Sequence, residues 1–164
     1  MRRSNASVFL ILALVTFVVA VLRWFMRGWM QSLHVSDTVG SMLMSLTIVL
    51  LIGLVILFAR EGRYAEGRYR SAAGWWIALA VWEQVLVIGG ILLAGRTGAS
   101  TYYSEMIAAH RDLPPVQHAI SHAIALALLI PIGLLLGWPV YWVMKRGRGR
   151  TSTAKPADRI QNSE

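Results

Sequence analysis

The segment AAGWWIALAVWEQVLVIGGILLAG, residues 72–95, contains a single charged residue, Glu83, within an otherwise apolar run. As a helix it would be about 36 Å long at 1.5 Å per residue, enough to cross a hydrocarbon core of roughly 30 Å. A spanning segment must satisfy its own backbone hydrogen bonds in lipid, and here the apolar residues are continuous rather than alternating. The segment therefore predicts a transmembrane helix.

Three more apolar stretches of spanning length lie at residues 6–22, 40–59 and 119–143. Hydrophobic residues make up 56% of the 164-residue chain, which is too apolar for an ordinary soluble domain of that size. We therefore predict an all-α integral membrane protein, a bundle of four transmembrane helices in one domain over residues 1–144. Residues 145–164 are polar and basic without apolar periodicity, which predicts a disordered tail.

The first stretch has a second interpretation, because basic residues 2–3 and the apolar run after them resemble a secretory signal that ends near Ala20. The polar stretch expected around a cleavage site is missing, since Val21 and Leu22 follow at once. A signal-anchor helix is therefore favoured.

The basic residues are divided unequally between the two predicted faces of the membrane. Four of the sixteen lie in the connections over residues 23–39 and 96–117, and the other twelve lie near the termini and in residues 60–70. Positively charged loops stay in the cytoplasm, so both termini are predicted to be cytoplasmic, in the plasma membrane or a bacterial inner membrane. The net charge of +8 is then a topology signal. The expected partners are the lipid bilayer and a membrane protein or second copy of the chain, with no nucleic acid.

The connections carry their own patterns. Residues 23–39 mix aromatic and methionine residues with Arg23, Arg27 and Gln31, which predicts a short interfacial helix, and Ser36 and Asp37 offer N-cap chemistry after it. Residues 103–110 are predicted to form another short helix. Residues 61–70, EGRYAEGRYR, nearly repeat one five-residue unit. This composition is typical of an interfacial loop with snorkelling side chains, and a docking site for an acidic partner or lipid is the alternative.

Glu83 and Gln84 are placed near the membrane midplane by helical rise, where a charge is costly. Glu83 belongs to a mostly small stripe at helical spacing, so it is predicted to face the bundle. The stripe consists of Ala80, Glu83, Val87, Gly90 and Ala94. Two interpretations stay open for Glu83: a proton or cation relay, or an interhelical hydrogen bond.

His118 and His122 are four residues apart, so both imidazoles lie on one helical face, as two ligands of one metal ion require. The zinc-protease motif is excluded because Ala119 stands where that motif has a glutamate. The missing ligands would come from the same predicted side of the membrane, namely Glu105, His110, Asp112, His34 or Asp37. No cofactor is expected beyond such a divalent metal, and hydrogen-bonded residues at a helix entrance or a pH-sensing role are the alternatives.

Small residues four apart predict close helix packing at Gly90 and Ala94 in the third span and at Gly133 and Gly137 in the fourth. Pro131 lacks a backbone N–H, so it predicts a kink. Helical rise leaves a vertical gap of about 10 Å between His122 and Glu83, which only a hydrated cavity would bridge.

No complete catalytic set is present, and the absence of cysteine removes thiolate chemistry. The leading hypothesis is a small membrane protein of unknown biochemical activity that acts as an accessory or self-associating component. The alternatives are a proton- or cation-coupled transporter or channel centred on Glu83, and a metal-binding membrane protein or enzyme that uses His118 and His122.

Overall fold

The computed structural model describes residues 5–43, 45–104 and 114–152, and these ranges contain no strand. The helices are α1 (Asn5–Ser32), α2 (Asp37–Leu43), α3 (Leu46–Arg63), α4 (Tyr69–Thr97) and α6 (Pro115–Ser152). Within the described ranges, four helical units are long and apolar enough to cross a membrane: α1, α2 together with α3, α4, and α6. The predicted all-α fold with four helices of transmembrane length is confirmed.

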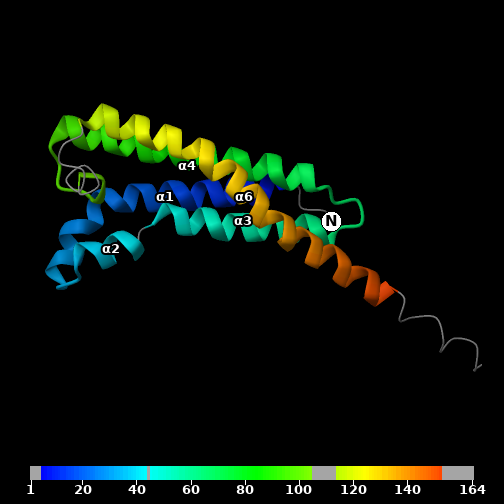
Figure 1. Cartoon of the computed structure of the whole chain (residues 1–164). Coiled ribbons are helices and arrows are strands. Elements are labelled where there is room, and N and C mark those ends of the chain that lie inside the picture. Colours follow the sequence, from blue (N-terminus) through cyan, green and yellow to red (C-terminus); the bar gives the residue numbers. More distant parts are fainter. Residues whose placement is uncertain (1–4, 44, 105–113, 153–164) are drawn as a thin grey trace, which may run out of the picture.

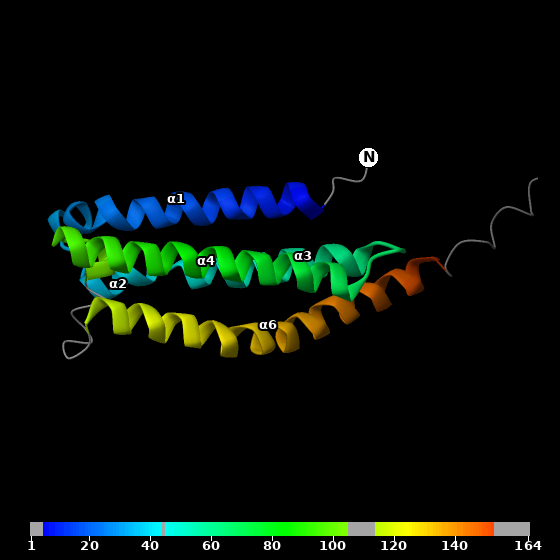
Figure 2. The same ribbon diagram turned by 90° about the horizontal axis from the view of Figure 1, so that it is seen from above.

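The long helices run side by side between two ends of the molecule, as Figure 1 shows from one side and Figure 2 from above. One end holds the α1–α2 turn with His34 and the start of α6 with His118 and His122. We name it the histidine end. The other end holds the start of α1, the α3–α4 connection and the end of α6, and we name it the basic end.

Large apolar side chains cover much of the outer surface of the bundle. The side chains of Leu10 on α1, Val55 on α3 and Leu135 on α6 are each at least half exposed, and many other large apolar side chains are also exposed. An apolar surface of this extent is far larger than a soluble monomer exposes, and it suits contact with lipid. The four apolar helices therefore suggest a membrane protein.

Helix α1 is longer than predicted, because it continues without a break through residues 23–32. The separate interfacial helix predicted for residues 23–39 is wrong. Its aromatic and methionine residues instead extend the apolar periodicity of α1, and Gly28 alone does not stop the helix. The helix ends in a tight turn, where His34 adopts a left-handed backbone with φ of 58°.

The second spanning unit consists of two helices, α2 and α3. Ser36 caps the start of α2, since its Oγ accepts a hydrogen bond from the Val39 N–H at 3.4 Å, as the predicted N-cap chemistry requires. Ser45 is the N-cap residue of α3, and its side chain makes no capping hydrogen bond. This break lets α2 diverge from the direction of α3 (Figure 1).

Helix α6 extends beyond the predicted 119–143 at both ends. Pro115 occupies its first turn, a position that suits proline because no N–H is needed there. Residues 145–152, which were predicted to belong to the disordered tail, are helical. The rest of the predicted tail lies outside the described residues.

The main core lies toward the basic end, where α3, α4 and α6 pack together. Its largest members, Phe58 and Trp76, are at most 1% exposed. Glycines in α6 allow this packing: a Cβ at Gly133 would lie 2.0 Å from Trp76, and one at Gly137 would lie 2.5 Å from Phe58. Helix α6 contains Pro131 and Pro139 and is bent along its length (Figure 2).

The α3–α4 connection is fixed by a buried carboxylate. Glu61 is 4% exposed and accepts hydrogen bonds from the Arg68 N–H at 3.0 Å and the Ser71 hydroxyl at 3.4 Å, and also from the Asn5 amide. Its counterpart in the repeated unit, Glu66, is exposed. The glutamates of the two copies therefore differ in burial, and Glu61 links the loop to Asn5 of α1 and Ser71 of α4.

Candidate functional site

A cavity of about 430 Å³ lies in the histidine half of the bundle, and we name it the histidine-end cavity. This volume has room for several water molecules. Its polar lining residues are Arg23, Ser41, Ser45, Thr47, Glu83, Gln84 and His122. The apolar lining residues are Met42, Leu46, Ile48 and Val87.

The cavity reaches from the surface to buried polar groups. Met42 is 64% exposed and Ile48 is 48% exposed, so these two residues form its rim. Arg23, Glu83 and Gln84 are at most 8% exposed and form its floor. The structure thus brings Glu83 and His122 into one cavity, across the gap expected from helical rise.

Glu83 lies on the face of α4 that the sequence predicted to be buried. All members of its stripe, Ala80, Glu83, Val87, Gly90 and Ala94, are buried. The stripe faces the other helices rather than the surface, so Glu83 is held inside the bundle.

Gln84 offers a hydrogen-bond acceptor in the cavity. Its Nε2 donates to Glu83 Oε2 at 2.9 Å. An ionised carboxylate has only acceptors, so the amide nitrogen must face it, and Gln84 Oε1 must face another direction. Among the described residues this buried oxygen has no hydrogen-bond partner. A buried acceptor without a donor costs about 1–3 kcal/mol, which a bound donor would recover.

Arg23 reaches the cavity because α1 continues past the predicted end of the first span. Its guanidinium lies over the ring of Tyr103, 5.0 Å from the centroid. Its positive charge attracts the Glu83 carboxylate. Sequence reasoning missed this role because it counted Arg23 among the cations of a loop. The signal was its spacing of three from Ala20 and seven from Met30, which continues the buried face of α1.

Tyr103 packs behind Arg23 in the segment that follows α4. Its hydroxyl donates to the Ala20 carbonyl at 3.3 Å. Burial raises the pKa of Tyr103 to about 12, although the Arg23 charge opposes the rise, and the Glu83 charge adds to it. The ring approaches α4 closely at Gly90, where a Cβ would lie 2.6 Å from it.

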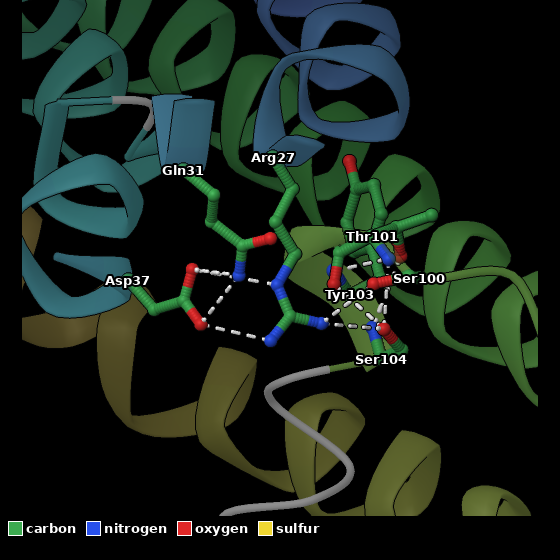
Figure 3. Close-up of polar contacts among 7 residues, drawn as sticks. All are labelled: Arg27, Gln31, Asp37, Ser100, Thr101, Tyr103 and Ser104. Atoms are coloured by element: carbon green, nitrogen blue, oxygen red, sulfur yellow. Dashed lines mark hydrogen bonds and ion pairs between the residues drawn. The ribbon is translucent and has the colours of Figure 1, made fainter. Parts of the chain in front are cut away.

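An ion pair ties α1 to α2, the helix that supplies Ser41 and Met42 to the cavity. Arg27 Nη2 donates to Asp37 Oδ2 at 2.9 Å, and Arg27 Nη1 donates to the Ser100 hydroxyl at 3.1 Å. Gln31 Nε2 donates to Asp37 Oδ1 at 3.0 Å, and Arg27 also reaches Ser104 (Figure 3). We name these five residues the Arg27 clasp. It joins α1, α2 and the segment after α4, so it holds α2 at the edge of the cavity.

The predicted metal ligands are only partly brought together. The rings of His118 and His122 lie 5.0 Å apart, and His118 is 3% exposed. Glu105, His110 and Asp112 lie outside the described residues. Asp37, a further possible ligand, is bonded to Arg27 and Gln31. No group of three metal-ligating side chains forms within the part of the chain that the structure describes.

The predicted packing residues lie against aromatic side chains of the same chain. Gly90 contacts Tyr103, and Gly133 contacts Trp76, while Ala94 is 2% exposed. Gly137 lies against Phe58. Each of these positions is therefore filled from within the bundle.

Comparisons with protein-family models, curated proteins and solved structures found no match to this chain.

Proposed function

We propose that this chain is a multi-pass protein of the plasma membrane, or of the inner membrane in a bacterium, with both termini in the cytoplasm and the histidine end outside. The apolar outer surface supports insertion, and the excess of arginine and lysine at the basic end supports the orientation.

The natural absence of cysteine makes the orientation simple to test. Ala99→Cys would place a single thiol at the histidine end, and Ala65→Cys would place one in the exposed loop of the basic end. In intact cells, a membrane-impermeant maleimide should label the thiol at position 99, and the thiol at position 65 only after permeabilisation. The reverse pattern would contradict the orientation.

Within this membrane, the proposed function is proton- or cation-coupled transport centred on Glu83. One observation carries it: the Glu83 carboxylate lines a cavity that reaches the surface and also contains His122. A carboxylate near the membrane midplane is costly and usually marks an ion or substrate path. Filled with water, this cavity would supply the access that such a path needs from the histidine end.

A carrier fits this geometry better than an open channel does. Between the cavity floor and the basic end lies the packed apolar core, where Leu57, Trp76 and Leu79 are at most 1% exposed. A carrier opens its central site to one side at a time, whereas a channel needs a continuous path. The described conformation is then the one open toward the histidine end.

The accessory, self-associating role stays a prediction with less support. It relied on the compact length of the chain, on the lack of a complete catalytic set, and on small residues that would let a second helix approach. Of these small residues, Gly133 and Gly137 already receive Trp76 and Phe58 of the same chain.

Reconstitution in liposomes tests the transport proposal. Purified protein should conduct protons or a monovalent cation along an imposed gradient, and Glu83→Gln should reduce this flux by at least about tenfold, because it removes the ionisable group. Glu66→Gln is the matched control, since Glu66 is an exposed glutamate in the basic-end loop. Absent flux, or equal flux in Glu83→Gln and the wild type, would defeat the proposal.

A further inference from the structure

The floor of the histidine-end cavity presents two opposite charges. Arg23 projects from α1 and Glu83 from α4, and each is at most 5% exposed. Buried charges are stable only when other groups compensate them, so any ligand that enters must suit both signs. A simple cation is attracted by Glu83 alone, and a simple anion is attracted by Arg23 alone. A ligand that carries both charges matches the floor.

The acceptor arrangement beside Glu83 indicates where the positive group would lie. Gln84 Oε1 is the buried acceptor that has no partner among the described residues, and it is adjacent in sequence to the carboxylate. An ammonium group has several N–H donors, so it can bond to the carboxylate and to this oxygen together. A quaternary ammonium has no N–H and would leave the Gln84 oxygen without a donor.

We propose that the histidine-end cavity binds a small zwitterion, with its ammonium group at Glu83 and Gln84 and its anionic group at Arg23. This inference rests on the proposed function and names the class of its substrate. Arg23 suits the anionic group because a guanidinium presents paired N–H donors to a carboxylate or phosphate. The apolar walls formed by Leu46 and Val87 would contact a short aliphatic part of the ligand.

Such a zwitterion has two natural sources, a water-soluble amino acid or the headgroup of an ethanolamine phospholipid. The volume of about 430 Å³ falls within the range of small-molecule sites, so either group fits. The exposed apolar rim at Met42 and Ile48 would accept the acyl chains of a lipid. Both sources share one chemistry, a primary ammonium joined to an acidic group.

Ligand-induced thermal stabilisation of the full-length protein in maltoside micelles tests the proposal. The soluble probes are leucine and phosphoethanolamine. Leucine amide, which lacks the anion, and N-acetylleucine, which lacks the ammonium, are the matched controls. Nanodiscs of phosphatidylglycerol with and without phosphatidylethanolamine supply the lipid arm. A zwitterion from one of the two sources should stabilise the protein, and leucine should bind at least about tenfold more tightly than either control if the source is soluble.

Charge-changing variants locate the two groups. Arg23→Gln should abolish the preference for leucine over leucine amide, and Glu83→Gln should abolish the preference over N-acetylleucine. Arg96→Gln, which replaces an exposed arginine of α4, should change neither ratio. If the lipid is the ligand, the same two variants should lose the stabilisation by phosphatidylethanolamine. The affinities of the wild-type protein for leucine, leucine amide and N-acetylleucine can be compared without any variant, so the test stands even if Arg23→Gln fails to fold.

The proposal is overturned if no zwitterion from either source stabilises the protein, or if leucine binds and a singly charged control binds as tightly. Failure of the proposed function looks different. If the protein selects zwitterions but shows no Glu83-dependent flux, the transport proposal fails and the zwitterion site stands. If it shows Glu83-dependent flux but does not select zwitterions, the transport proposal stands and the zwitterion site fails.

Discussion

Gly90→Ala should destabilise the protein by forcing Tyr103 away from α4. The added Cβ would lie 2.6 Å from two ring atoms, about 1 Å closer than an ordinary contact. The ring has little room to move, because Tyr103 is 1% exposed and its hydroxyl donates a hydrogen bond to the Ala20 carbonyl. Overpacking of this kind costs about 1–3 kcal/mol.

Gly89→Ala is the matched control, one position away in the same helix. Nothing lies within 4 Å of the Cβ that it would add. Both substitutions gain about 1 kcal/mol of helix propensity, so this contribution cancels in their difference. Unfolding of both variants in mixed micelles should therefore place Gly90→Ala about 1–3 kcal/mol below Gly89→Ala. Equal stabilities would refute the close contact between Tyr103 and α4.

Three further measurements address other parts of the structure. In the Arg27 clasp, a double-mutant cycle of Arg27→Gln and Asp37→Asn should give a coupling energy of about 0.3–1 kcal/mol that decreases in high salt, and zero coupling would contradict the ion pair. Because the folded pKa of Tyr103 is about 12 and its ordinary value is 10.0, the unfolded chain should ionise first. The free energy of unfolding, relative to Tyr103→Phe, should therefore be constant below about pH 10 and fall between about pH 10 and 12, and parallel pH profiles would count against burial. At the basic end, Glu61→Gln should destabilise by about 1–3 kcal/mol and Glu66→Gln by less than about 0.5 kcal/mol in thermal unfolding, whereas equal effects would contradict the buried network.

The number and type of the helices could be predicted because length and continuous apolarity are local properties. The course of residues 23–32 could not be predicted so simply. Their arginines and aromatics suit an interfacial helix and also suit an extension of α1, and only packing against α4 and Tyr103 selects the second. The N-cap of α3 at Ser45 has no glycine or proline beside it, so it too lacks a local signal.

The candidate site was predictable in part. Glu83 is the single charged residue of the third span, and the mostly small stripe to which it belongs predicts that it points into the bundle. The role of Arg23 depends on where α1 ends, and the shared cavity depends on how α2, α3 and α6 diverge at the histidine end. The spacing of Arg23 from Ala20 and Met30 is compatible with an extended α1, but the helix end and the shared cavity are tertiary properties that spacing alone does not decide. The possible metal site also depends on such convergence, which the described residues do not provide.

The central claim is that water from the histidine end enters the cavity that Glu83 lines, and a thiol at Ser45 tests it most directly. Ser45 lines the cavity and its side chain makes no capping hydrogen bond, so Ser45→Cys is a mild substitution. Ala80→Cys provides the control, because Ala80 is 0% exposed in the apolar core. In right-side-out vesicles, a small impermeant cationic thiol reagent should modify the cysteine at position 45 rapidly and the one at position 80 hardly at all. Equal, slow modification of both thiols would contradict the account.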